Sequence, residues 1–471
     1  MPTHSAVVVI GAGPGGYVAA FHAADLGLSV TLIDKAQNPG GVCLYRGCIP
    51  SKALLHAAKL LTEAEEAKNI GIDFAQPMVN LDKLRAWKDW VVSKLTGGLG
   101  SLTKQRKITY VQGEAVFTGS SSLGIKKPDG LSDTLTFDKA ILAAGSRPVE
   151  LPFLPKSNRV WDSTSALSLP YIPQTLLIIG GGYIGMELGC AYSALGSKIT
   201  VVEALPQLLN GADRDLADMV IRRLNKDFTK IMVNTKVLRA EETAEGITVW
   251  FADKDGKEFQ ETFAQVLASI GRKPNTEGLG LEHTKVKLSP KGFIEVDAQR
   301  RTTDANIFAI GDIAGQPMLA HKASAEAKIA AETIAGHKVA FEPKVIPAVV
   351  FTNPELAWVG LTEIEAKEKN LDVTVFKFPW AASGRALTLD RTDGITKVIA
   401  DPKTKRILGI GIAGMNAGDL ISEGALAIEM GAVADDLALT IHPHPTLSEM
   451  IMETAEGLFG HCTHIARAKK P

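Results

Sequence analysis

The stretch AVVVIGAGPGG, residues 6–16, decides the fold of this chain. Its apolar run leads directly into glycines spaced as GxGxxG, which are Gly11, Gly13 and Gly16. A helical pattern and a second apolar run follow, and that run ends in Asp34. Such glycines make a tight turn and admit a pyrophosphate at a helix N-terminus, while the acid binds ribose hydroxyls. The order of strand, glycines, helix and acid therefore predicts a Rossmann-like dinucleotide-binding unit.

The same pattern returns further along the chain. An apolar run at 176–179 precedes a second glycine motif, and the next apolar run again ends in an acid. The residues of this second unit are Gly180, Gly182, Gly185 and Glu203. Gly180 lies 169 positions after Gly11, and Glu203 lies equally far after the first acid. Because one ungapped register is difficult to obtain twice by chance, two dinucleotide sites are predicted.

The composition limits which classes of protein this chain can belong to. The 471 residues are enough for about three domains of ordinary size. Lys and Arg number 51 against 52 for Asp and Glu, a balance that favours neither nucleic acid nor an anionic membrane as a partner. The N-terminal segment lacks a signal-peptide pattern, and no run of about 18 apolar residues predicts a membrane span. We therefore expect a cytoplasmic protein.

Two of the four cysteines lie just after the first unit, in GGVCLYRGCIPSK, residues 40–52. On a regular helix, Cys43 and Cys48 would point about 140° apart, so a bond between them needs a distorted turn. The neighbouring glycines permit one, and Pro50 is able to open a helix at its first position, which would favour a Cys48 thiolate. The alternatives are unreactive core thiols or half of a zinc site. A structural zinc site needs four ligands, however, and the other two cysteines stand alone, so no metal is expected.

Together, the two units and the cysteine pair resemble class I of the pyridine nucleotide-disulfide oxidoreductase family over essentially the whole length. Within the family, the chain is similar to members that oxidise protein-bound dihydrolipoyl groups. The resemblance implies an α/β fold with two Rossmann-like dinucleotide-binding domains, for FAD and NAD, and a C-terminal α+β dimerisation domain. It also implies a redox-active disulfide between Cys43 and Cys48, with tightly but non-covalently bound FAD.

The resemblance divides the chain into four segments. They are an FAD-binding domain at 1–150, an NAD-binding domain at 151–273, a central segment at 274–345 that completes the FAD domain, and a dimerisation domain at 346–471. In the last segment, short strand-like runs alternate with turns and with helical patterns at 362–370 and 419–430, which is typical of an α+β domain.

The family's cofactor-binding positions map onto glycines, acids and a few other residues of this sequence. Those expected to bind FAD are Gly11, Gly13, Gly16, Asp34, Lys52, Gly145, Ser146, Asp312 and Ala320. Those expected to bind NAD are Gly180, Gly182, Gly185, Glu203 and Gly271. From its pattern alone, Asp312 is equally well explained as a turn cap. Glu203 favours NAD over NADP, because a carboxylate repels a 2′-phosphate.

Roles beside the flavin follow from the same resemblance. Cys43 is expected to exchange with the dithiol substrate, and Cys48 to pass electrons to the flavin. Lys52 is expected at the flavin ring, paired with Glu187, although a surface ion pair would explain the two charges as well. Tyr183, inside the second glycine motif, is expected to cover the flavin until the nicotinamide displaces it.

The C-terminal motif HPHPTLSE, residues 442–449, supplies the remaining chemistry. Disulfide exchange needs a base with a pKa near neutral, because a thiolate must attack and a protonated sulfur must leave. The resemblance assigns this role to His444, oriented by Glu449, with a cis bond before Pro445. Spacing alone also explains Thr446 and Glu449 as a capping box at the start of a helix.

The family also implies partners. The chain is expected to form a homodimer in which His444 reaches the cysteine pair of the other subunit. Expected substrates are the lipoyl domains of 2-oxo acid dehydrogenase complexes or the glycine cleavage H protein. Another NAD(P)H-dependent disulfide reductase of the same family is the alternative enzyme, and a flavoprotein scaffold without turnover is the non-enzymatic one.

Overall fold

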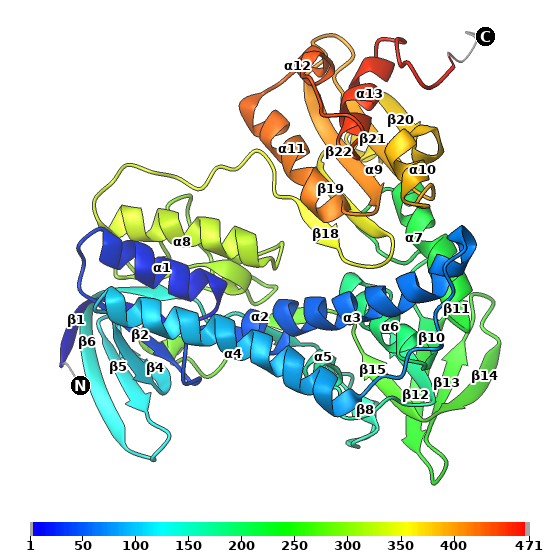
Figure 1. Ribbon diagram of the computed structural model, residues 1–471. Helices are drawn as coiled ribbons and strands as arrows, with labels where there is room; N and C mark the ends of the chain where they lie inside the picture. The colour runs from blue at the N-terminus through cyan, green and yellow to red at the C-terminus, as the bar shows by residue number, and fades with distance from the viewer. Residues whose placement is uncertain (1–2, 467–471) are drawn as a thin grey trace.

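The computed structural model describes residues 3–466 and contains three units, each built on a sheet (Figure 1). The strands of the first sheet are β1 (His4–Ile10), β2 (Val30–Asp34), β3 (Thr109–Gln112), β4 (Glu114–Gly119), β5 (Ser122–Lys126), β6 (Ser132–Leu142) and β17 (Ile307–Ala309). Their order is β3-β2-β1-β6-β5-β4, with β17 also paired to β6. The pairs among β1, β2, β3, β6 and β17 are parallel, and β4 and β5 continue the sheet antiparallel.

Helices cover the first sheet and link it to the second. They are α1 (Pro14–Asp25), α2 (Gly41–Arg46), α3 (Cys48–Glu66), α4 (Leu81–Gln105) and α8 (Ala320–Ile334). Helices α1 and α8 lie side by side, while α3 and α4 extend from the first sheet towards the second (Figure 1). The chain returns to this sheet at β17, from beyond residue 300, and α8 then packs beside α1.

The second unit repeats the parallel design. Its main sheet contains β8 (Val160–Trp161), β9 (Thr175–Ile179), β10 (Lys198–Val202), β11 (Lys230–Met232) and β15 (Gln265–Ala268), in the order β11-β10-β9-β15-β8. A separate antiparallel sheet contains β12 (Lys236–Glu242), β13 (Ile247–Ala252) and β14 (Glu258–Phe263). The helices are α5 (Ser163–Leu167), α6 (Tyr183–Ala194) and α7 (Arg214–Asp227). Strands β7 (Ser146–Pro148) and β16 (Arg272–Pro274) pair where the chain passes between the two units.

The third unit is an antiparallel sheet with helices, as predicted for an α+β domain. Its strands are β18 (Ala348–Val350), β19 (Glu355–Gly360), β20 (Thr374–Pro379), β21 (Ile395–Ala400) and β22 (Ile407–Gly414), in the order β18-β19-β22-β21-β20. Its helices are α9 (Glu363–Glu368), α10 (Gly384–Thr388), α11 (Ala417–Met430), α12 (Ala434–Leu439) and α13 (Glu449–Gly457). The predicted fold class is therefore confirmed. Within residues 3–466, no helix is long and apolar enough to span a membrane.

The internal repeat extends to individual hydrogen bonds. Asp34 accepts the Ala12 N–H at 2.6 Å, and Glu203 accepts the Gly181 N–H at the same distance. The second oxygen of each acid accepts the N–H two residues further on, at 2.8 Å in both units. Each acid therefore fixes its own glycine turn, and the 169-residue offset is preserved in the geometry.

Two details of helix starts differ from the sequence-based expectation. Helix α3 begins at Cys48, so Pro50 occupies its third position and not its first. This is tolerated because the first four N–H groups of a helix have no intrahelical partner. Helix α13 has Ser448 as its N-cap, so the predicted capping box does not form around Thr446. Half of it survives, since the Thr446 N–H donates to Glu449 Oε2 at 2.7 Å.

A buried carboxylate joins all three units at the end of α3. Glu66 pairs with Arg223 of α7, and its other oxygen lies 2.5 Å from the Arg391 guanidinium of the third unit. All three side chains are less than one-fifth exposed. Helix α3 therefore runs from the cysteine pair at its N-terminus to an ionic junction of the three units at its C-terminus.

A second ionic cluster joins the second and third units. The Lys397 ammonium on β21 lies 2.5 Å from Asp213, 2.8 Å from Asp215 and 2.9 Å from Glu363. Lys377 adds a second cation, 2.7 Å from Asp215. The three carboxylates are close enough to hold a metal ion, but the Lys397 ammonium contacts all of them and supplies the positive charge.

Candidate active site

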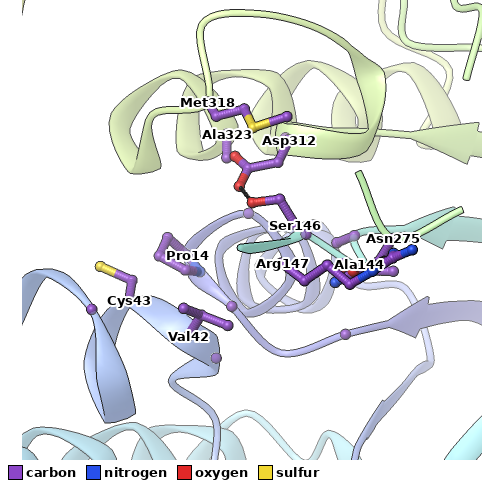
Figure 2. A pocket seen from close by; sticks show the side chains of 18 of the residues that line it. Pro14, Val42, Cys43, Ala144, Ser146, Arg147, Asn275, Asp312, Met318 and Ala323 are labelled. Carbon is purple, nitrogen blue, oxygen red and sulfur yellow. Dashed lines mark hydrogen bonds between the residues drawn. The ribbon is translucent and has the colours of Figure 1, made fainter. Parts of the chain in front are cut away.

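A cavity of about 660 Å³ lies between the first and second units. It begins at the first glycine motif, where Pro14 lies close to Val42 and Cys43, and it ends beyond Ser146 and Asp312 (Figure 2). The lining residues that the structure describes all precede residue 324, so they come from the first and second units. Most of the predicted FAD ligands share this one cavity: Gly11, Gly13, Asp34, Lys52, Gly145, Ser146, Asp312 and Ala320.

Gly16 is the predicted FAD ligand that lies outside this lining. A Cβ at Gly16 would be 1.7 Å from the Gly11 carbonyl oxygen, so only glycine lets α1 pack against the turn. Its equivalent in the second motif, Gly185, is also too close to its own turn for a side chain, with a Cβ position 2.6 Å from the Gly180 oxygen. Both glycines therefore allow the following helix to pack against the turn, and neither lines the cavity.

The cysteine segment packs directly on the first glycine motif. The Gly40 N–H donates to the Ala12 carbonyl at 2.7 Å. Gly41 has a φ of +58°, and a Cβ there would be 2.4 Å from the Gly13 Cα. A side chain at position 41 would therefore separate α2 from the turn. This contact places Cys43, two residues later, in the wall of the cavity beside Pro14 (Figure 2).

A break between two helices at Gly47 brings the two cysteines together. It is the distorted turn that the cysteine spacing predicts. Helix α2 ends at Arg46 and α3 begins at Cys48, and a Cβ on Gly47 would be 2.9 Å from the Val42 carbonyl oxygen. Cys43 and Cys48 are free thiols in this structure, and the Cys43 thiol donates a hydrogen bond to the Cys48 sulfur. The structure therefore describes the reduced, dithiol form of the pair.

The pKa values of the two thiols shift in opposite directions. The hydrogen bond that Cys43 donates raises its own pKa and is the largest cause that lowers the pKa of Cys48, to about 7. Burial opposes this lowering, and the positive charge of Lys52 adds to it. The start of α3 at Cys48 agrees with the predicted preference for a thiolate at a helix N-terminus.

Lys52 and Glu187 form an ion pair that is not on the surface. The ammonium lies 2.7 Å from Glu187 Oε2, and the Glu187 side chain is 4% exposed. The same oxygen accepts the Ser51 hydroxyl at 3.0 Å, and the other accepts the Phe351 N–H at 3.0 Å. The surface-pair alternative is therefore wrong for Glu187. Ser51 and Phe351 were missed by sequence reasoning.

Asp312 lies across the cavity from the cysteine segment. Its carboxylate accepts the Ser146 hydroxyl, and Ser146 also receives two hydrogen bonds from Arg272, at 2.8 Å to Oγ and 2.6 Å to its carbonyl oxygen (Figure 2). These contacts connect the short 3-10 helix after β17 (Gly311–Ala314) with β7 and β16, so they fix the wall between the two units. Asp312 faces the cavity, unlike a simple turn cap. Arg272 is a third residue that the sequence did not reveal.

The second glycine motif lies next to this cavity but outside its lining. Tyr183, the first residue of α6, lines the cavity, and burial raises its pKa to about 12. The predicted NAD ligands Gly180, Gly182, Gly185, Glu203 and Gly271 are absent from the described lining. Of the second motif, Tyr183 and Ile184 therefore reach the cavity, while its glycines do not line it.

His444 and Glu449 form the predicted pair in the third unit. His444 Nδ1 lies 2.8 Å from Glu449 Oε1, and the peptide bond before Pro445 is cis. Burial raises the pKa of Glu449, but the hydrogen bonds from the Thr446 N–H and His444 outweigh it and bring the pKa below its ordinary value. The His444 side chain is 78% exposed, and the cavity lining described for this chain stops well before it.

Two family models match the chain. The one described as pyridine nucleotide-disulphide oxidoreductase covers residues 5–327, and the one described as its dimerisation domain covers 346–455. Dihydrolipoyl dehydrogenase of Haemophilus influenzae is 50% identical over 466 residues, which are 98% of this chain and 97% of the relative. The enzyme of that name from Geobacillus stearothermophilus is 48% identical and covers 97% of both chains.

Solved structures of similar fold also cover nearly the whole chain. LpdA from Mycobacterium tuberculosis has a TM-score of 0.88 and 26% identity, covering 96% of this chain and 99% of its own. The Cu(II) complex of the HOCl-induced flavoprotein disulfide reductase RclA from Escherichia coli has a TM-score of 0.87 and 28% identity, covering 97% and 99%.

Proposed function

The chain belongs to the pyridine nucleotide-disulphide oxidoreductase family, and from this premise we propose that it is an NAD-dependent dehydrogenase acting on protein-bound dihydrolipoyl groups. The observation that carries the proposal is the dithiol at the end of the cavity. The pKa of Cys48 is lowered to about 7, partly by Lys52, and Cys43 lines the same cavity. The net reaction converts a dihydrolipoyl group and NAD⁺ into the lipoyl disulfide, NADH and a proton.

The residues of the first unit fit FAD. The N-cap of α1 is Gly13, which has no side chain to occupy the helix N-terminus, so the first-turn N–H groups suit a pyrophosphate. We assign the adenosine ribose to Asp34 and the ribityl chain to Asp312, with Gly145, Ser146 and Ala320 along the same wall. When bound, FAD supplies the two-electron acceptor between the dithiol and NAD.

The second motif fits NAD by the same logic. Gly180 and Gly182 repeat the turn, Gly271 follows the last parallel strand, and Glu203 stands where Asp34 stands in the first unit. A carboxylate at that position favours two ribose hydroxyls and repels a 2′-phosphate. We therefore propose NAD as the nucleotide substrate, with Tyr183 separating its site from the cavity.

The roles of the sulfur atoms follow from their surroundings. We assign Cys43 to exchange with the dihydrolipoyl dithiol, because the lowered pKa of Cys48 beside Lys52 suits the other sulfur to the flavin. The exchange reduces the Cys43–Cys48 disulfide and leaves the substrate oxidised. Cys48 lies one helical turn before Lys52, whose positive charge favours its thiolate, and we assign it to electron transfer towards the flavin. Lys52 and Glu187 form an ion pair at this end of the cavity, so their charges neutralise each other.

We propose a homodimer in which His444 of one subunit serves the cysteine pair of the other. The match of residues 346–455 to a dimerisation-domain model supports the dimer. The exposure of His444 and its distance in the chain from Cys43 support the shared site. Exposed apolar side chains of the third unit suit a surface that is covered in a dimer, and they include Leu426, Met430, Leu439 and Ile441.

Glu449 completes this proposal. Because it is held by the Thr446 N–H, it fixes His444 Nδ1 and leaves Nε2 to take or give the proton during exchange.

The proposal also keeps the four-segment division at 1–150, 151–273, 274–345 and 346–471, of which residues 1–2 and 467–471 lie outside the described range. Lipoyl domains of 2-oxo acid dehydrogenase complexes or the glycine cleavage H protein are the proposed partners, in the cytoplasm.

The test is direct. Purified protein is mixed with NAD⁺ and either free dihydrolipoamide or a reduced lipoyl domain, and NADH formation is followed by absorbance. Wild type is expected to reduce NAD⁺ with both, and Cys48→Ser is expected to be inactive while retaining FAD. The alternative, another disulfide reductase of the family, predicts no NADH from either donor but oxidation of NAD(P)H by a different disulfide such as glutathione disulfide.

A further inference from the structure

Phe351 connects the third unit to the charge beside the dithiol. It directly follows β18, inside the region that matches the dimerisation-domain model. Its backbone N–H donates to Glu187 Oε1 at 3.0 Å, and its ring centroid is 4.4 Å from Lys52 Nζ. Two different parts of Phe351 therefore contact the two members of one buried ion pair.

The Lys52 ammonium is held by these contacts. On one side it lies 2.7 Å from Glu187 Oε2, and on another it meets the face of the Phe351 ring. An aromatic face attracts a cation through its quadrupole, most strongly where water is displaced. Lys52 is also four positions after Cys48 in α3, which is about one helical turn, so its position sets how strongly its charge acts on the sulfur.

We propose that Phe351 is a positioning residue that holds the Lys52 ammonium between Glu187 and Cys48. Without the ring, the ammonium gains freedom to turn to solvent, while the Glu187 carboxylate stays fixed by Ser51 and by the backbone. The electrostatic potential at the Cys48 sulfur then becomes more negative, because the Lys52 ammonium has moved away and the Glu187 carboxylate has not. The third unit thus sets the reactivity of a thiol in the first unit of the same chain.

The inference rests on the proposed function only in taking Cys48 as a reacting thiol, and its test needs no turnover. The FAD-loaded protein is reduced, freed of reductant under nitrogen, and pulsed with iodoacetamide across a pH series. Trypsin cleaves after Arg46 and Lys52, so Cys48 is released in a peptide without Cys43. Mass spectrometry of that peptide then gives the apparent pKa of Cys48 alone.

Removing the ring is expected to raise that pKa. For Phe351→Leu, an ordinary cation–π contribution predicts a rise of about half a unit, so alkylation at pH 6 falls about threefold. Phe351→Tyr keeps the ring and is expected to behave as wild type. The matched control is Trp250→Leu, which removes a cation–π contact with Arg239, at 3.5 Å, in the separate sheet of the second unit. It is expected to leave Cys48 unchanged.

A double variant separates positioning from a general structural effect. Lys52→Gln alone is expected to raise the pKa of Cys48, and adding Phe351→Leu to it is expected to produce no further rise. If Phe351→Leu shifts the pKa equally in both backgrounds, or in neither, the inference is wrong. If Phe351→Leu does not retain FAD, Phe351→Met gives the same comparison, because it fills a similar volume without a ring. Failure of the proposed function would show separately, as no NADH formation from NAD⁺ and dihydrolipoamide by wild type, whatever the pKa of Cys48.

Discussion

Cys48 is the one described cysteine whose pKa moves downwards. Burial raises the pKa of Cys190 to about 12 and that of Cys462 to about 11, and the hydrogen bond to Cys48 raises that of Cys43. The hydrogen bond from Cys43 and the positive charge of Lys52 therefore make Cys48 the described cysteine that most readily forms a thiolate.

Removal of the Cys43 thiol tests the main cause of this difference. In Cys43→Ala, Cys48 loses its hydrogen-bond donor, so its pKa is expected to rise from about 7 towards the ordinary value of 9.0. The rate of Cys48 alkylation would then fall at neutral pH and approach that of wild type above pH 9. Cys190→Ala, which removes a buried thiol elsewhere, is the control. An unchanged alkylation profile in Cys43→Ala would contradict the assigned cause.

Glu203 gives a second prediction for a single residue. Because like charges facing each other cost several kcal/mol, wild type is expected to prefer NAD over NADP by about two orders of magnitude in kcat/KM. Glu203→Ala with an added arginine nearby is expected to reduce that preference. Glu203 also holds the Gly181 N–H, so thermal stability is measured alongside, to separate turn disruption from nucleotide choice. Equal use of both nucleotides by wild type would show that the assignment is wrong.

At the scale of elements, the important feature is the junction between α2 and α3. Two short-range effects create it: Gly41 lets α2 contact the glycine turn, and Gly47 lets α3 start against the last turn of α2. The cysteines are adjacent because the chain changes direction between them. Their reactivity therefore depends on a glycine that carries no chemistry.

Gly47→Ala tests the junction. Its Cβ would be 2.9 Å from the Val42 carbonyl oxygen and 3.2 Å from the Cys43 Cα, so the two helices must separate. Oxidation of the Cys43 and Cys48 thiols to a disulfide is expected to slow at least about tenfold, since intramolecular exchange depends strongly on geometry. Thiol titration against time after addition of an oxidant measures it. Gly98→Ala, in the middle of α4 with open space around it, is the control and is expected to have no effect.

The sequence predicted those elements whose cause is local. A strand, a glycine turn, a helix and an acid lie within about thirty residues of each other, so the pattern alone located β1, α1, β2 and their repeats. The positions of Lys52 and Glu187 required the family resemblance. The contacts of Phe351 and Arg272 were not predictable, because they join segments more than a hundred positions apart in the chain. The cap of α13 was misread because Glu449 is held by a backbone N–H while the helix starts two residues later than a Thr446 cap would require.

At the scale of the whole molecule, ionic contacts join units that also share one hydrophobic cluster, in which Leu54 of the first unit and Leu356 of the third pack with the second. The Lys397 cluster joins the second and third units, and Glu66 joins all three. Lys397→Met would leave three carboxylates without their shared cation, so we expect a loss of about 3 to 5 kcal/mol in the free energy of unfolding. Lys405→Met, at an exposed pair with Asp435, is the control and should cost less than about 1 kcal/mol. Denaturant titration of both variants makes the comparison.

The same cluster predicts a pH dependence. Burial raises the pKa of Asp215, but hydrogen bonds from Lys377 and Lys397 outweigh it and bring the pKa below its ordinary value. A lowered folded-state pKa contributes stability that is complete above the unfolded-state pKa, near 3.8, and is lost as the pH falls through the folded-state value. The difference in stability between wild type and Asp215→Asn should therefore be constant at neutral pH and shrink in strong acid. A difference that grows with acidity would contradict the sign.

The dimer gives the last prediction. A heterodimer of Cys48→Ser and His444→Gln chains carries one site with both intact cysteines and an intact histidine if sites are shared. Purified by two different tags, it is expected to have about half of the wild-type activity per dimer, from simple site counting. The two parent homodimers, which lack one component at every site, are the controls. An inactive heterodimer that is intact and holds FAD would exclude the shared site.

The matched hydrogen bonds of the two nucleotide units also carry historical information. Asp34 and Glu203 hold their turns through the same atoms at a constant offset, which is the pattern left when one ancestral module is copied in tandem. In such a history, novelty arises where the copies diverge. The cysteine segment follows only the first unit, and the second unit holds its turn with matching hydrogen bonds, so the glycine turn and the dithiol are separable features of this chain.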